Sequence, residues 1–392
     1  MAIFPSAHPA RKKVLCAGIC SLILAMGVAR FAYTPLLPLM RAQAGLSVVG
    51  AGWLATVNYS GYLLGALLSS LITDIVLKDR LYRAGMIVAV FSTALMAVSG
   101  SFGLWAVSRF IAGLSSAAGM LLGSGLTFNW LMRHGQRPEL GIHFAGIGIG
   151  IAVCAAAVEI MTPAWNWREQ WIAFAVLGGV LLVPVLGWLP RPDRGKSHSP
   201  GASLSDRPLS ARFFGTLMAA YFFAGIGFVV SATFIVAIVN ALPGLAGHGT
   251  LVFLWIGLAA APSCMFWDLL ARRSGEINAL ILAAAVQIVG ILLPVWPGGL
   301  GCAVIGGVLF GGSFAGLVSL VLTLAGRYYP TRPATMMGRM TLAYGVAQII
   351  APAATAWLAT RSGSYATGLY AASASMVACT ALLFMLKRIR PS

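Results

Sequence analysis

The sequence predicts an all-α integral membrane protein, with twelve transmembrane helices arranged as two pseudo-symmetric six-helix bundles. The first observation is composition: 59% of the 392 residues are hydrophobic and only 9% are charged, whereas soluble proteins are about one quarter charged. The second is pattern, because the apolar runs are continuous rather than alternating, which favours helices over a membrane barrel. The third is an internal repeat between the two halves of the chain.

Twelve apolar runs approach or exceed the roughly 20 residues that a helix needs to cross a bilayer. We expect spans at residues 14–40, 50–73, 84–101, 104–131, 140–162, 170–189, 211–240, 250–270, 276–296, 299–326, 334–359 and 366–386. The longest interruption, residues 191–210, is rich in Pro, Gly, Ser and basic side chains, which is typical of a flexible linker. The chain therefore divides into an N-terminal bundle (1–190), a cytoplasmic linker (191–210) and a C-terminal bundle (211–392).

Matching residues in the two halves indicate the repeat. Offsets of 198, 197 and 194 residues align Gly27 with Gly225, Arg30 with Phe228, Gly113 with Gly311, Gly141 with Gly338, Gly148 with Gly345 and Asp74 with Asp268. Parallel six-span repeats around a site near the middle of the bilayer are typical of carriers.

The formal net charge of +17 does not indicate nucleic-acid binding, because the basic residues cluster in short segments between apolar runs. This distribution is the positive-inside pattern of membrane proteins. With the N-terminus in the cytoplasm, every Lys and Arg falls on the cytoplasmic side except Arg30, Arg41, Arg109, Arg168 and Arg361. We therefore expect a multi-pass protein of the bacterial inner (plasma) membrane with both termini in the cytoplasm.

Several kinds of chemistry have no matching motif in the sequence. The six cysteines all lie in apolar runs, without the spacing of a metal site or a disulfide framework. The glycine-rich stretch GIGIGIAV at 146–153 lies inside a span and lacks the strand–turn–helix context of a dinucleotide site. We expect no cofactor, no metal and no enzymatic activity.

The first span contains the most informative stretch, Gly27–Met40, which is apolar apart from Arg30, Tyr33 and two prolines. A charge within a span is costly and usually faces a bundle interior or a water-filled cavity. Breaks at Gly and Pro are tolerated where neighbouring groups satisfy the backbone. We interpret this stretch as the first cavity helix of a membrane carrier, with Arg30 and Tyr33 as substrate-binding residues.

Glu159 is the acidic residue that the expected boundaries put well inside a span. Counted along their helices, Arg30 and Glu159 lie at similar depths. A lone buried carboxyl tends to be protonated, whereas one that faces an arginine tends to ionise. We therefore expect Glu159, together with Arg30, to couple transport to protons; the alternatives are a fixed ion pair and a Glu159 at the wet outer end.

The other substrate-binding candidates are polar or aromatic side chains within the spans of both halves. They are Asn58, Tyr59, Tyr62, Arg109, Tyr221, Ser231, Thr233, Tyr344 and Gln348. Isolated polar side chains in a span commonly join helices rather than bind a ligand. Tyr344 and Gln348 stand out because they share one helix face in a stretch interrupted by glycine and proline. Arg109 has two open interpretations, a cavity residue or a side chain that snorkels to the membrane interface.

Several segments resemble the major facilitator superfamily and, within it, the YbfB/YjiJ group of bacterial permeases. These are ARFAYTPLLPLM, WLATVNYSGYLLGAL, SATFIVAIV, GRMTLAYGVAQIIAP and RFIAG. The superfamily motif after helix 2 is degenerate here, with Ser70 in the place of its first glycine. Helix 5 lacks the proline found in many antiporters. The resemblance implies a proton-driven or facilitative small-molecule carrier.

The acidic and basic residues after the second and eighth spans are candidates for an inner gate. They are Asp74 with Arg80 and Arg83, and Asp268 with Arg272 and Arg273. An acid at a helix end can pair with loop arginines and with a facing helix end, closing the gate in one state. The alternative is a solvated charge run that only sets topology. The second copy favours the gate, and the first copy favours the alternative.

Together these observations predict a secondary active transporter that moves a small organic solute by alternating access, coupled to protons. The alternatives are a facilitative uniporter and a proton-antiport efflux carrier for drugs or sugars; a membrane-embedded enzyme and a channel fit less well. The expected partners are the solute, protons and the lipid bilayer, with no nucleic acid, and the expected state is a monomer.

Overall fold

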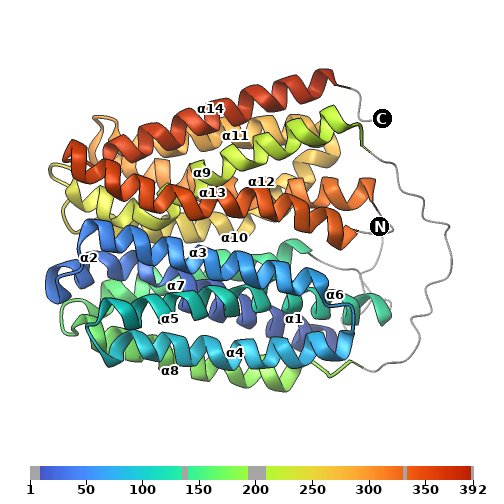
Figure 1. Cartoon of the computed structure of the whole chain (residues 1–392), viewed down its shortest axis with the longest axis horizontal. Coiled ribbons are helices and arrows are strands. Elements are labelled where there is room, and N and C mark those ends of the chain that lie inside the picture. The colour runs from blue at the N-terminus through green and yellow to red at the C-terminus, as the bar shows by residue number, and fades with distance from the viewer. Residues whose placement is uncertain (1–8, 135–139, 193–208, 330–332, 390–392) are drawn as a thin grey trace.

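The computed structural model describes residues 9–134, 140–192, 209–329 and 333–389, and within these ranges all regular elements are helices (Figure 1). The first half contains α1 (Pro9–Leu22), η1 (Ile23–Phe31), α2 (Tyr33–Ala44), α3 (Val48–Leu71), α4 (Ile75–Val98), α5 (Phe102–Ala117), η2 (Ala118–Gly123), α6 (Ser124–Arg133), α7 (Leu140–Met161) and α8 (Trp167–Trp188). The second half contains α9 (Ala211–Ala241), α10 (Gly249–Ser274), α11 (Glu276–Leu292), η3 (Leu293–Val295), α12 (Gly299–Tyr328), α13 (Pro333–Ser362) and α14 (Ala366–Arg388). The expected all-α fold is confirmed.

Some spans are built from more than one element. Continuous helix runs from Ala10 to Ala44 through α1, η1 and α2, and from Phe102 to Arg133 through α5, η2 and α6. Eleven helices in the described part of the chain are long and apolar enough to cross a membrane. The twelfth expected span corresponds to α3, which has 24 residues but falls outside that set. Its polar residues lower its hydropathy, and it is covered by α5 on one side and α13 on the other.

The third span begins at Ile75 rather than at residue 84, so the basic segment expected as a loop is the first part of α4. Asp74 caps this helix, because its Oδ1 accepts a hydrogen bond of 2.9 Å from the Val76 amide. Arg83 pairs with Asp79 at 3.0 Å, and its Nη atoms donate to the carbonyls of Leu186 and Leu189 at the end of α8. These partners allow charged residues to lie within a packed helix. The expected linker, 191–210, falls largely outside the described residues.

The internal repeat is visible in the helix packing. Gly113 of α5 lies against the backbone of Asn58 in α3, and Gly311 of α12 lies against the backbone of Ile256 in α10. Both members of the second pair follow the first by the same 198 residues. Glycine at each crossing lets two backbones approach more closely than any side chain would permit.

The two halves meet along three helix pairs, α7 with α10, α3 with α13, and α2 with α9 (Figure 1). Thr56 Oγ1 donates to the carbonyl of Ile349 at 2.9 Å, and Thr34 Oγ1 donates to the carbonyl of Ala232 at 2.8 Å. Thr34 and Ala232 are themselves 198 residues apart. Equivalent residues of a two-fold repeat can touch only close to the axis, so this hydrogen bond marks where the pseudo-symmetry axis passes.

Gly113→Ala is expected to destabilise the fold. An added Cβ would meet the Asn58 carbonyl and the Tyr62 amide, which are backbone atoms and cannot rotate away. Overpacking of this kind costs about 1–3 kcal/mol, and the midpoint of thermal unfolding in detergent should fall accordingly. Gly125→Ala is the matched control, since nothing lies within 4 Å of its added Cβ. Equal midpoints for both variants would contradict the tight crossing.

Candidate functional site

The first span is interrupted where the sequence analysis expected a break. Residues Ile23–Phe31 form a π-helix, and the Ala32 amide donates to the Gly27 carbonyl, five residues back, at 2.8 Å. Pro35 follows at once and has no amide hydrogen to donate to the preceding turn. Within a membrane, the backbone carbonyls that such a break exposes must accept hydrogen bonds from a neighbouring polar group.

Arg109 of α5 supplies that polar group. Its Nη1 donates to the Ala29 carbonyl at 3.0 Å and its Nη2 donates to the Arg30 carbonyl at 3.1 Å. The guanidinium also lies over the ring of Tyr33, with Cζ 4.7 Å from the centroid. Asn58 in turn donates to the Arg109 carbonyl at 2.8 Å. Arg109 is only 3% exposed, so it braces the broken helix from inside the bundle.

Arg30 is equally buried, at 4% exposure, but its surroundings differ. Its Cζ lies 4.5 Å from the ring centroid of Tyr59 and 4.3 Å from that of Tyr62, both on α3. These are cation–π contacts, which suit a desolvated guanidinium. Its Nη1 lies 4.0 Å from the weak acceptor Sδ of Met26, and within the described residues its Nε is buried without a hydrogen-bond partner. Among the described residues, no carboxylate forms an ion pair with it.

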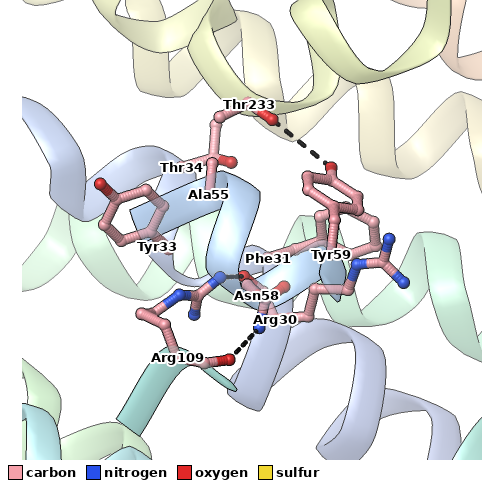
Figure 2. A pocket seen from close by; sticks show the side chains of 9 residues that line it. All are labelled: Arg30, Phe31, Tyr33, Thr34, Ala55, Asn58, Tyr59, Arg109 and Thr233. Atoms are coloured by element: carbon pink, nitrogen blue, oxygen red, sulfur yellow. Dashed lines mark hydrogen bonds between the residues drawn. The ribbon is translucent and has the colours of Figure 1, made fainter. Parts of the chain in front are cut away.

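Both arginines line a small cavity between the halves (Figure 2). Its volume is about 10 Å³, near the lower limit for one water molecule. The lining residues are Arg30, Phe31, Tyr33, Thr34, Ala55, Asn58, Tyr59, Arg109 and Thr233. Across the cavity, the Tyr59 hydroxyl and Thr233 Oγ1 are 3.4 Å apart, which joins α3 to α9. Six of the expected substrate-binding residues therefore gather here: Arg30, Tyr33, Asn58, Tyr59, Arg109 and Thr233.

The remaining expected residues lie in or beside the interface. Tyr62 contacts Arg30 directly, and Tyr221 stacks on Tyr344 with centroids 4.5 Å apart and planes at 27°. Ser231 and Gln348 are buried, and Ser231 Oγ has no hydrogen-bond partner.

The expected partnership of Arg30 and Glu159 is not formed. Glu159 lies in the last turn of α7 and is exposed, whereas Arg30 is buried. Arg30 instead meets the rings of α3. The acidic residue that the expected boundaries missed is Asp79, which is buried and pairs with Arg83. The expected span began at residue 84, whereas α4 begins at Ile75 and therefore includes Asp79.

The gate candidates lie at helix ends. Arg83 is engaged with α8 inside the first half. Asp268 pairs with Arg272 at 2.7 Å one turn away on α10, and both side chains are well exposed. Asp74 caps α4, while Arg80 and Arg273 are exposed. At the opposite end, Arg41 donates to the Tyr365 hydroxyl at 3.3 Å and joins α2 to the start of α14.

An aromatic group in the second half was not foreseen. Phe228 of α9 lies 5.0 Å from Phe314 and 6.3 Å from Phe310 of α12, and 5.9 Å from Tyr344 of α13 (ring centroids). We call these four rings with Tyr221 the aromatic cluster. One signal was available, because the repeat aligns Phe228 with Arg30. Isolated phenylalanines in apolar runs otherwise give no hint of a common location.

The family described as "Uncharacterised MFS-type transporter YbfB" matches residues 22–384, which is nearly the whole chain. The chain belongs to this family of the major facilitator superfamily. This family is one of transporters rather than enzymes, as the sequence predicted, and the apolar helices make the chain a multi-pass membrane protein.

Similar proteins are also transporters. The inner membrane transport protein YdhP of Escherichia coli K12 is 25% identical over 174 residues, or 43% of this chain and 44% of YdhP, so the match spans less than half of that relative. The purine ribonucleoside efflux pump NepI of Salmonella paratyphi B is 26% identical over 289 residues, covering 71% of this chain and 70% of NepI. The crystal structure of the nucleoside transporter NupG shares the fold, with a TM-score of 0.72, 13% identity and coverage of 98% and 100%.

Arg109→Lys is expected to lower stability by about 1–3 kcal/mol. Lysine keeps the charge but is a single point donor, so one of the two carbonyls of the broken helix loses its partner. Thermal unfolding of the purified protein in detergent measures the effect. Arg361→Lys is the control, because Arg361 is exposed and stacks only on Trp357. If both variants unfold at the same temperature, Arg109 does not brace the first span.

Proposed function

We propose that this transporter moves a small organic solute by alternating access, binding it between the two halves at Arg30. One observation carries the proposal: Arg30 is a buried guanidinium with no carboxylate partner in the described structure, at the edge of a cavity in the interface. A buried charge without a partner is strongly disfavoured. A solute that supplies an anionic or hydroxyl acceptor would satisfy it.

The helix contacts between the two halves and the small cavity at their interface are compatible with alternating access. The helix pairs α2–α9, α3–α13 and α7–α10 are in contact, and the cavity between them has room for about one water molecule. A solute must therefore enter by separation of the halves at one end. Contacts such as Arg41 with Tyr365 and Thr34 with Ala232 would break when their end opens. Rocking of two rigid bundles about a central site is the motion that a parallel repeat supports.

Purine ribonucleosides are a second candidate for the solute. The observation that favours them is the match to NepI, which is described as a purine ribonucleoside efflux pump and aligns with 71% of this chain. The purine ring of a nucleoside would stack on aromatic side chains. The ribose hydroxyls, and the carbonyl of an oxopurine, would accept hydrogen bonds from Arg30.

We further propose that both termini are cytoplasmic, on the strength of the positive-inside pattern, and that the transporter acts as a monomer in the bilayer. Coupling to protons, with facilitative uniport as the alternative, is also part of the proposal. The gating role of the Asp74 and Asp268 segments belongs to the same proposal, as groups that would make contacts in one state and release them in the other.

Arg30→Ala is expected to abolish solute flux. Proteoliposomes are loaded with single solutes from a panel of purine ribonucleosides, aromatic carboxylates and sugars, and uptake of the labelled form of each is followed. A carrier gives saturable uptake that is accelerated by unlabelled solute on the far side. Arg361→Ala is the control and should retain it, since that side chain lies far along α13 at an exposed end. Undiminished flux in correctly inserted Arg30→Ala protein rules out the assignment, and flux that never saturates indicates a channel.

Glu159→Gln tests proton coupling. If Glu159 is the titrating group, the variant should lose the dependence of flux on pH, because glutamine cannot exchange a proton at working pH. The measurement is the initial rate of uptake across a range of external pH, in variant and parent proteoliposomes. A variant with an unchanged pH profile clears Glu159 of any role in coupling.

A further inference from the structure

The aromatic cluster comes from three helices of the second half. Tyr221 and Phe228 lie on α9, Phe310 and Phe314 on α12, and Tyr344 on α13. Successive ring centroids are between 4.5 and 6.3 Å apart, from Tyr221 to Tyr344, then Phe228, then the pair on α12. Rings at such distances form a continuous apolar surface suited to contact with another flat ring.

This surface faces Arg30 across the interface. Tyr344 lies on α13, which packs against α3, the helix of the first half that carries Tyr59 and Tyr62. Gly345, the next residue, lies directly against Leu63, the neighbour of Tyr62 on α3. The guanidinium between the rings of Tyr59 and Tyr62 is therefore on one wall of the interface, and the aromatic cluster is on the other.

The pseudo-symmetry explains why the two walls differ. Arg30 and Phe228 are 198 residues apart, the same separation as Thr34 and Ala232 at the axis. Equivalent positions of the repeat thus present a cation in one half and a ring in the other. The site is symmetric in backbone position and asymmetric in chemistry, so it matches a solute with one charged end and one flat apolar end.

The charge around this site has a single sign. The described acidic residues all lie at a helix cap or in the first or last two turns of a helix: Asp74, Asp79, Glu159, Glu169, Asp268 and Glu276. None of them lines the cavity, whereas two arginines do. Both Nη atoms of Arg109 donate to carbonyls and only its Nε lacks a partner in the described structure, whereas the described residues give Arg30 no carbonyl or carboxylate partner, so Arg30 has more donor groups to offer. One available guanidinium matches one negative charge.

We propose that the solute is a planar aromatic monoanion, such as an aryl carboxylate. Its carboxylate accepts hydrogen bonds from Arg30, and its ring lies against the surface that Phe228 and Tyr344 form in the aromatic cluster. The guanidinium fork can bind a carboxylate through two parallel hydrogen bonds. This inference rests on the proposed transport function and adds the class of solute.

The test compares four probes in binding to the purified full-length protein at neutral pH, by isothermal titration calorimetry. Benzoate has both features, cyclohexanecarboxylate keeps the charge without the flat ring, benzyl alcohol keeps the ring without the charge, and inosine is a neutral nucleoside. We expect benzoate to bind about threefold or more tighter than cyclohexanecarboxylate, from the stacking contribution. It should bind at least about tenfold tighter than benzyl alcohol or inosine, from the charge-assisted hydrogen bonds.

Two variants divide the contributions. Arg30→Gln should weaken benzoate at least about tenfold and leave benzyl alcohol unchanged, while Phe228→Leu should remove the preference for benzoate over cyclohexanecarboxylate. Arg361→Gln is the control and should bind benzoate like the parent, and unchanged thermal unfolding verifies that each variant is folded.

Equal binding of benzoate and cyclohexanecarboxylate overturns the aromatic part of the proposal. Equal or tighter binding of benzyl alcohol or inosine overturns the charge, and absence of benzoate binding at about 10 mM overturns both. In each of these cases, saturable and trans-stimulated uptake of another solute that requires Arg30 would leave the carrier function standing. Loss of that uptake behaviour for every solute would overturn the carrier function itself.

Discussion

The site depends on how two buried guanidinium groups are satisfied. A guanidinium inside a membrane bundle must find acceptors, because the lipid offers none. Arg109 finds them in the carbonyls of Ala29 and Arg30, which the π-helix and Pro35 leave at the edge of the first span. The break in the helix and the buried charge therefore stabilise each other. Arg30 lies in the same break and contacts the rings of Tyr59 and Tyr62 and the thioether of Met26.

In the proposed function, this arrangement gives Arg109 a structural role and Arg30 a solute-binding role within one short segment. Arg109 fixes the path of the first helix, and Asn58 holds the backbone of Arg109 in turn. Arg30 is thereby held at a defined position with no carboxylate partner and with its Nε unpaired among the described residues. A carrier needs such a group, since binding energy must come from contacts that the protein cannot make for itself.

The two-fold repeat organises the rest of the molecule. The crossing of Gly113 with Asn58 recurs as that of Gly311 with Ile256, and the contact of Gly345 with Leu63 recurs as that of Gly148 with Ala261. The halves are thus packed in a similar way and touch along equivalent helices. Their difference lies in the side chains near the axis, where the first half offers two arginines among its tyrosine rings and the second offers the aromatic cluster without a cation. The proposed transport by rocking and the proposed selective binding are compatible for this reason.

The sequence by itself determined the fold class, the number of spans, the repeat and the break in the first helix. These properties follow from hydropathy, from glycine and proline, and from the cost of a charge in lipid, all of which act locally along the chain. It also selected the residues that gather at the cavity, because polar side chains in apolar spans are few. The tertiary structure alone decided which groups meet. In the folded structure Glu159 is exposed, and Asp79 pairs with Arg83 near the start of α4, where Arg83 also binds carbonyls at the end of α8. Phe228, Phe310 and Phe314 come together from two helices. Pairings between distant residues depend on helix rotation and packing, and a single sequence carries no local signal of either.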